Sequence, residues 1–177
     1  ETLLDPGDIV ICSSPSYFVF LGILGYLGVR AVGVDVDAEG MLPGRLEETL
    51  EQLERQGDRD RIKAVYLVPY SDNPAGITMS AKRGEDILEI VRRWSGEQRI
   101  HLVADEAYRS LQYEGENIPS IRSLDPDGMT VIVAGTFSKS FSPGMRVGWG
   151  ILPVGIVESL LDQKGKIDFG SRFLTSG

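Results

Sequence analysis

The sequence predicts a three-layer α/β/α fold, in which helices cover both faces of a mainly parallel sheet with one antiparallel strand. Short apolar runs of strand length alternate with longer helix-like segments along most of the chain. Several runs are apolar at consecutive positions, which is typical of strands that are buried on both faces. The composition agrees, because 177 residues with 42% hydrophobic side chains suit one domain with its own core.

The expected sheet has six strands and is largely parallel. The sixth strand begins about a dozen residues after the fifth ends, and the connection includes Ser142-Pro143-Gly144. A parallel crossover needs at least that length and usually a helix, so the sixth strand is expected to be antiparallel. The expected strands are 9–12, 31–36, 62–68, 100–104, 130–134 and 147–152.

Amphipathic periodicity places helices between the strands. In the segment 45–56, Leu46, Leu50 and Leu53 are spaced four and three residues apart, and glutamates occupy the other side. This pattern predicts a helix with one buried face and one solvated acidic face. Further helices are expected at 17–27, from about residue 80, and from Pro153.

The first expected helix carries Gly22 and Gly25, and Gly28 follows at the same spacing of three residues. This pattern differs from the G-x-G-x-x-G loop that holds dinucleotides, so it does not indicate a nucleotide site. We interpret the glycines as positions of close helix packing, and we expect Gly28 to end the helix.

Charge and composition exclude several classes of function. A net charge of −8 and a pI near 4.7 argue against nucleic acid as a partner, because phosphate backbones require a basic surface. Cys12, the single cysteine, excludes an internal disulfide and is expected to be a small buried strand residue. With His101 as the single histidine, no metal site is expected. The longest apolar segment, 17–29, is too short to cross a membrane, so a cytoplasmic location is expected.

One lysine follows an apolar strand among hydroxyl-bearing residues. Lys139 comes directly after Thr136-Phe137-Ser138, and Arg146 follows seven residues later. A lysine attacks a carbonyl group once its ammonium is deprotonated, and partial desolvation beside another cation favours that step. The arginine can direct two donors to a phosphate, and the two hydroxyl groups can add more. The stretch therefore predicts an amine-bearing site that holds an anion.

Polar side chains also follow two other strands of the predicted sheet. Asn73, Asp105 and Lys139 each lie just past a strand end, at separations of 32 and 34 residues. Ligands of open α/β sheets bind outside the carboxyl ends of the strands, so we expect these side chains to share one cleft. These groups match pyridoxal 5'-phosphate. The amine can bind its aldehyde, the carboxylate can pair with its ring nitrogen, and the phosphate-binding cluster can hold its phosphate.

These residues resemble the class I/II aminotransferases of the aspartate aminotransferase fold, which are fold type I pyridoxal-phosphate enzymes. The resemblance runs from about Pro6 to Trp149. The chain departs from the family pattern at Ala75, where threonine is usual, and at Thr136, where serine is usual. The markers are Pro15-Ser16-Tyr17, Asn73-Pro74-Ala75-Gly76, Asp105-Glu106-Ala107-Tyr108, Ser138-Lys139 and Pro143-Gly144-Met145-Arg146-Val147-Gly148-Trp149.

The resemblance implies a role for each matched residue. Lys139 resembles the lysine that holds the cofactor as a Schiff base, the internal aldimine, and that then shuttles the substrate proton. Asp105 resembles the carboxylate that pairs with the pyridinium nitrogen, and with Lys139 and Tyr108 it forms the expected catalytic set. Asn73 and Tyr108 resemble the donors to the phenolic oxygen of the ring, and Tyr17 resembles the aromatic residue stacked on it. The expected phosphate ligands are Thr136, Ser138 and Arg146.

The resemblance implies a homodimeric aminotransferase of amino-acid metabolism, which moves an amino group from an amino acid to a 2-oxo acid. Two alternatives stay open: a lyase of the aminocyclopropane-carboxylate synthase type, and the effector domain of a MocR-type transcription regulator. Residues 1–177 are expected to form most of the cofactor-binding large domain of a longer protein, without its N-terminal segment and C-terminal small domain. A separate hypothesis is that this fragment alone is inactive, because substrate-binding residues are missing. Arg172 is not expected to be the arginine that binds the carboxylate of the substrate in this family.

Overall fold

In the part of the chain that the structure describes, seven strands form a single sheet. A computed structural model describes residues 2–96 and 98–168, and the strands are ordered β3-β2-β1-β4-β5-β6-β7. Arg172 lies outside the described residues. The strands are β1 (Ile9–Ser14), β2 (Arg30–Asp37), β3 (Gly40–Met41), β4 (Ile62–Leu67), β5 (His101–Asp105), β6 (Val131–Thr136) and β7 (Gly148–Ile151).

The five central strands are parallel and both edge strands are antiparallel. β2, β1, β4, β5 and β6 pair in parallel in that order, and β7 pairs antiparallel with β6. These pairings confirm the predicted parallel sheet and its antiparallel last strand. The sequence does not predict β3, which runs antiparallel to β2, because two residues are too few to show a strand pattern.

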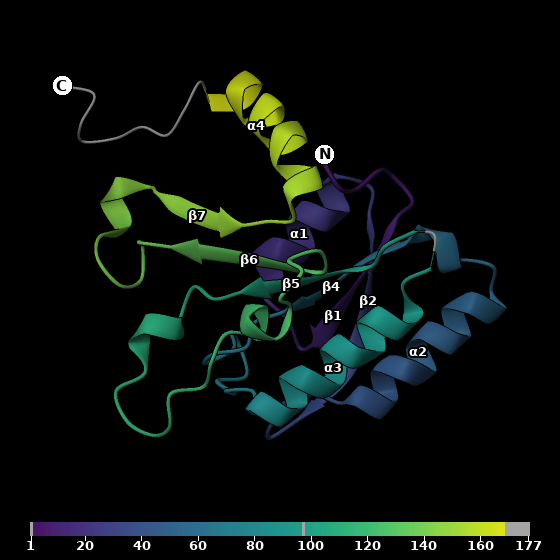
Figure 1. The fold of residues 1–177 in the computed structure, drawn as a ribbon, viewed down its shortest axis with the longest axis horizontal. Coiled ribbons are helices and arrows are strands. Elements are labelled where there is room, and N and C mark those ends of the chain that lie inside the picture. Colours follow the sequence, from purple (N-terminus) through teal and green to yellow (C-terminus); the bar gives the residue numbers. More distant parts are fainter. Residues whose placement is uncertain (1, 97, 169–177) are drawn as a thin grey trace.

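Helices cover both faces of the sheet, which confirms the three-layer prediction. α2 (Pro43–Arg55) and α3 (Ala81–Trp94) lie side by side over one face, and α1 (Phe18–Tyr26) lies on the other (Figure 1). α4 (Val154–Asp168) follows β7 and lies near α1, with which it lines a shared groove. The 3-10 turns are η1 (Arg59–Arg61), η2 (Arg109–Leu111), η3 (Ile121–Leu124) and η4 (Pro143–Met145).

The alternation of side chains along the strands divides the core into two clusters. The larger cluster lies between the sheet and the pair α2 and α3, and it includes Ile11, Leu67 and Ile87. The smaller cluster lies under α1 and includes Cys12 and Leu24. Cys12 is 1% exposed, and burial raises the pKa of its thiol to about 12. This confirms the prediction that Cys12 is a buried strand residue.

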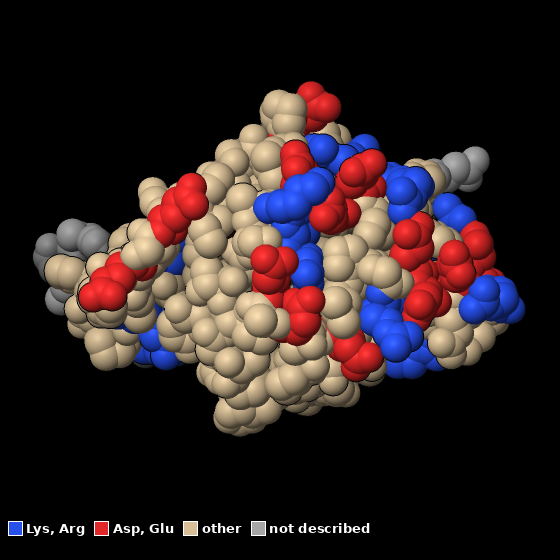
Figure 2. All heavy atoms as spheres, turned by 90° about the horizontal axis from the view of Figure 1, so that it is seen from below, with Lys and Arg blue, Asp and Glu red and all other residues tan. Residues whose placement is uncertain are grey.

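Acidic and basic side chains are interspersed over the surface seen in Figure 2. The glutamates of α2 each pair with an arginine, which confirms the solvated acidic face predicted for this helix. Exposed pairs of this kind contribute about 0–1 kcal/mol each, so they keep the surface soluble more than they hold the fold together. The pairs are Glu47 with Arg93, Glu48 with Arg45, Glu51 with Arg55, and Glu54 with Arg59.

α1 has one open face. Gly28 has φ of +71° and ends the helix, as expected. A Cβ atom added at Gly22 or Gly25 would meet nothing within 4 Å, so the prediction of close packing through these two glycines is wrong for this chain. The reason is that both glycines lie on the side of the helix that no described residue covers. None of the described helices is long and apolar enough to cross a membrane.

A buried carboxylate holds the start of β6. Asp125 is 1% exposed and accepts hydrogen bonds from the backbone N–H groups of Thr130 and Val131, each at 2.9 Å. Arg92 of α3 donates to the same side chain at 2.7 Å. Burial alone would raise the pKa of Asp125, but these donors hold it below its usual value. The strand that leads to Lys139 therefore depends on one charged side chain.

We expect Asp125→Ala to lower the free energy of unfolding by about 2–4 kcal/mol, because two buried N–H groups and an arginine lose their acceptor. The stabilisation from Asp125 is present above about pH 4 and is lost as the pH falls through its lower folded pKa, so the loss shrinks in acid. Urea unfolding followed by circular dichroism measures it. The exposed Asp127→Ala is the matched control, and equal midpoints for the two variants would contradict the role of Asp125.

Candidate functional site

One cavity lies at the carboxyl ends of the central strands. Its volume is about 340 Å³, within the range of small-molecule sites. Strands β4, β5 and β6 are parallel neighbours, so the segments that follow them meet at the same edge of the sheet. The structure brings all eight candidate residues to this cavity: Tyr17, Asn73, Asp105, Tyr108, Thr136, Ser138, Lys139 and Arg146.

Asp105 ends β5 with both carboxylate oxygens hydrogen-bonded. Oδ1 accepts from the backbone N–H of Ala107 at 3.1 Å, and Oδ2 accepts from the hydroxyl of Tyr66 at 2.8 Å. Burial, and then the charge of Asp105, raise the pKa of the Tyr66 phenol, so this hydroxyl stays protonated and donates. Each carboxylate oxygen has two lone pairs, so Asp105 can also accept from a cationic donor in the cavity.

Tyr108 links two other candidate residues. The Nζ atom of Lys139 lies 5.5 Å from the centre of the Tyr108 ring, which is a cation–π contact. Asn73 Nδ2 donates to the Tyr108 hydroxyl at 3.5 Å, a long hydrogen bond that a closer ligand atom could replace. An amide, a phenol and an amine thus lie in sequence along one wall of the cavity.

The loop after β6 is shaped by its own hydrogen bonds. Thr136 Oγ1 accepts from the Ser138 N–H at 3.0 Å and donates to the Val147 carbonyl at 3.3 Å. Arg146 has φ of +53°, a left-handed conformation that is uncommon for residues other than glycine and is often found at functional sites. Because the Thr136 hydroxyl already donates to the backbone, Ser138 and Arg146 are the readier donors to a ligand.

Two cations at the cavity have no acidic partner. Within residues 2–96 and 98–168, neither Lys139 nor Arg146 forms an ion pair or a side-chain hydrogen bond. In a chain of net charge −8, two such cations at one cavity indicate an anion site. Both side chains are exposed, so the expected partial desolvation of the lysine is not present in this chain. The reason is that the sheet surface beside them, at Ala134 and Gly148, is uncovered.

A second carboxyl group lies near Asp105, on Asp72. It is 8% exposed, and burial raises its pKa to about 6; the neighbouring Asn73 N–H lowers the pKa and the charge of Asp105 raises it further. None of the sequence motifs includes Asp72 or gives it a role. The motifs also miss Tyr66, because a tyrosine in an apolar strand gives no polar signal. Only the register of β4 against β5 shows that Tyr66 meets Asp105.

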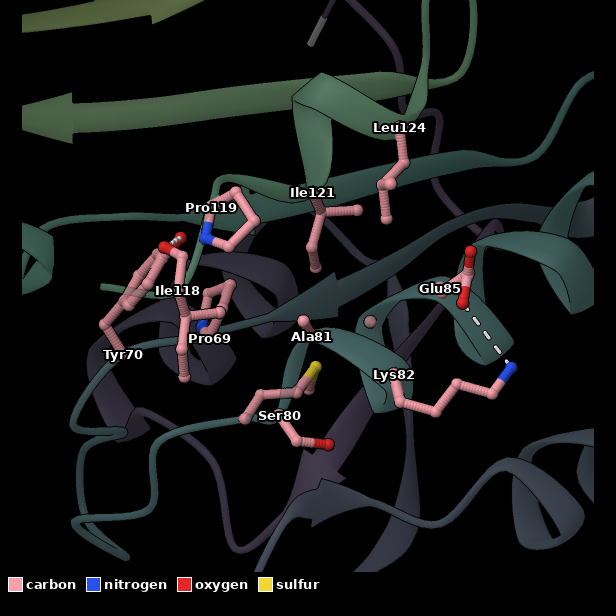
Figure 3. Close-up of a pocket in the computed structure, with 12 residues that line it drawn as sticks. Pro69, Tyr70, Ser80, Ala81, Lys82, Glu85, Ile118, Pro119, Ile121 and Leu124 are labelled. Carbon is pink, nitrogen blue, oxygen red and sulfur yellow. Dashed lines mark hydrogen bonds and ion pairs between the residues drawn. The ribbon is translucent and has the colours of Figure 1, made fainter. Parts of the chain in front are cut away.

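A second cavity, of about 190 Å³, lies on the other face of the sheet and is lined mainly by apolar side chains (Figure 3). Its polar groups already have partners. Lys82 pairs with Glu85 at 3.5 Å, and the Tyr70 hydroxyl donates to the Ile118 carbonyl at 3.2 Å. Among the described residues that line it, we see no unpaired charge comparable to that of Lys139, so the first cavity is the candidate site.

A family model described as aminotransferase class I and II matches residues 1–174. The aromatic-amino-acid aminotransferase 1 of Thermococcus litoralis is 36% identical over 168 residues, which are 95% of this chain and 39% of that protein. The uncharacterized HTH-type transcriptional regulator YdfD of Bacillus subtilis is 34% identical over 173 residues, which are 98% of this chain and 33% of that protein.

Solved structures of aminotransferases are also similar to this chain. An archaeal alanine:glyoxylate aminotransferase has a TM-score of 0.89 and 39% identity, over 96% of this chain and 40% of that chain. A kynurenine aminotransferase of Pyrococcus horikoshii, solved in complex with PMP and KYN as substrates and KYA as products, has a TM-score of 0.88 and 36% identity, with the same coverage. The chain thus spans 33–40% of the length of these four proteins.

We expect Asp72→Asn to change how stability depends on pH. The folded pKa of about 6 lies above the unfolded value, so the stabilisation from protonated Asp72 is full below about pH 4 and is lost as the pH rises through 6. The wild type should therefore lose stability between pH 4 and pH 8 that the variant keeps. Relative to the wild type, the free energy of unfolding of the variant should rise by about 1–2 kcal/mol over this range. Urea unfolding at both pH values measures this gain. Asp127→Asn, at an exposed site, is the control, and an equal gain there would refute the assignment.

Proposed function

The chain belongs to the aminotransferase class I and II family, and on that premise we propose that the whole protein is a PLP-dependent aminotransferase. It would move an amino group from an amino acid to a 2-oxo acid. The fold supports this proposal, and so do relatives named as aminotransferases, one of them solved with PMP. The relatives carry different substrate names, so the proposal extends to the reaction and not to one substrate.

One observation carries the proposal: an amine without an acidic partner and an oriented carboxylate share one cavity. Lys139 and Asp105 both line it, from the ends of neighbouring parallel strands. An aldehyde ligand needs the amine, and a protonated ring nitrogen needs the carboxylate.

The residues present fit pyridoxal 5'-phosphate. Arg146 and Ser138 can donate to the phosphate, since neither side chain has an acceptor among the described residues. Thr136 can join them once its hydroxyl turns away from the Val147 carbonyl. Tyr17 lines the same cavity and can lie against the face of the ring. Every part of the cofactor therefore has a matching group in this chain.

Bound pyridoxal 5'-phosphate supplies an aldehyde that condenses with amines and a protonated ring that accepts electrons. Lys139 Nζ would provide the amine that holds this aldehyde, and the same amine would be the base available to a proton on a bound substrate. Asp105 would keep the ring nitrogen protonated, because its carboxylate would place a negative charge beside that nitrogen. Asn73 and Tyr108, which both line the cavity, would donate hydrogen bonds to the phenolic oxygen and hold the ring in place.

A second candidate function is ligand sensing in a transcription regulator. The match to YdfD, an HTH-type transcriptional regulator, covers 98% of this chain at 34% identity, close to the values for the aminotransferase of Thermococcus litoralis. A DNA-binding segment elsewhere in the whole protein would favour this function. The residues at the cavity serve both functions equally, since each requires the cofactor to be bound.

The homodimer and the cytoplasmic location stay predictions for the whole protein. α1 supports the dimer, because a helix that is apolar around its circumference is normally covered. Four of its aromatic and aliphatic residues are exposed, at 76%, 41%, 51% and 89% for Phe18, Val19, Ile23 and Tyr26. A surface of this kind is suited to contact with another apolar surface.

We expect incubation with pyridoxal 5'-phosphate and reduction with borohydride to label Lys139, because it is the amine that the cavity presents to the aldehyde. Peptide mapping by mass spectrometry locates the label. Lys139→Ala should lose it, and Lys82→Ala, at an exposed lysine beside the second cavity, should keep it. Labels spread over all exposed lysines in proportion to their exposure would refute the proposed cofactor site.

A further inference from the structure

Tyr66 is part of the cavity, yet none of the proposed roles uses it. It lies on β4 and pairs in register with Val103 of β5, so Asp105 follows two residues further along β5 on the same face of the sheet. The side chain is 3% exposed. Its hydroxyl donates to Asp105 Oδ2 at 2.8 Å, which makes it the only described side chain bonded to that carboxylate.

The ring of Tyr66 is held in place by α1. Phe20 stacks on it, with ring centroids 3.9 Å apart and an interplanar angle of 22°. A stacked aromatic pair adds about 0.5–1.5 kcal/mol beyond the burial of its area. Because the ring is packed between a helix and the sheet, its hydroxyl cannot swing away from Asp105.

The two hydrogen bonds of Asp105 together fix the plane of its carboxylate. Oδ1 is held by the backbone N–H of Ala107, and Oδ2 is held by Tyr66. A carboxylate with the backbone bond alone could still rotate, because the terminal torsion of aspartate has a broad energy well. The tyrosine hydroxyl removes this freedom and leaves a lone pair on each oxygen for a ligand.

We propose that Tyr66 is a positioning residue, which orients the Asp105 carboxylate toward the protonated ring nitrogen of a bound pyridine ligand. The inference rests on the proposed function, because it requires such a nitrogen to face Asp105. Tyr66 acts through Asp105, and its effect depends on the charge of the ligand ring. A ligand without that nitrogen gains nothing from an oriented carboxylate.

Tyr66→Phe tests this inference, because it keeps the stack on Phe20 and removes only the hydroxyl. The measurement is the dissociation constant of the 177-residue protein for pyridoxal 5'-phosphate and for its analogue with CH in place of the ring nitrogen. We expect the variant to bind pyridoxal 5'-phosphate about tenfold more weakly, about 1.4 kcal/mol, since a hydrogen bond to a charged group is lost. Binding of the analogue should change by less than about twofold, because it has no cation for Asp105.

Tyr70→Phe is the matched control. Tyr70 is also 3% exposed, and its hydroxyl donates to a backbone carbonyl in the second cavity, so binding of both ligands should be unchanged. Equal losses for both ligands in Tyr66→Phe would show a purely structural role and overturn the inference, while the proposed function would stand. A wild-type protein that binds both ligands with the same affinity would overturn the role of Asp105, and the inference with it.

Discussion

The parallel pairing of β4, β5 and β6 is the constraint on which the rest of the structure depends. Ala104 of β5 pairs with Leu67 of β4 and with Val133 of β6, so the three strands end close to one level. The segments that carry Asn73, Asp105 and Lys139 therefore leave the sheet at the same edge, although they lie far apart in the sequence. The backbone hydrogen bonds between the parallel strands bring these segments together. Each side chain then needs only to lie on the face of the sheet that carries the cavity.

Asp105 ends β5 and Glu106 follows it directly, yet these two adjacent acidic residues have different surroundings. Asp105 lies in the cavity, whereas Glu106 lies on the opposite side and is 4% exposed. Glu106 accepts hydrogen bonds from the Ser120 hydroxyl and, at 3.3 Å, from Arg109, so it fastens the connection that follows β5 to the sheet. Tyr108 belongs to that connection. Its place in the cavity thus depends on a charge that is buried on the far side of the sheet.

The fold could be predicted because a two-sided buried strand has a clear sequence pattern, and the candidate residues could be predicted because each follows such a strand. Tyr66 could not, because its bond to Asp105 depends on the register between two strands. Asp72 could not, because nothing in a turn sequence shows that its carboxyl is buried. The packing predicted for Gly22 and Gly25 was wrong because their spacing is the same whether or not a neighbour covers the helix.

The site attracts anions because, in the part of the chain that the structure describes, two of its cationic side chains have no acidic partner. The glutamates of α2 are matched by arginines at the surface, whereas Lys139 and Arg146 have no acid beside them among the described residues. Both cations are exposed, and in water two unit charges at 4 Å interact by only about 1 kcal/mol. The same charges act several times more strongly at an effective dielectric constant near 20. The strength with which this cavity holds an anion therefore depends on how far the uncovered surface of β6 and β7 is shielded from water.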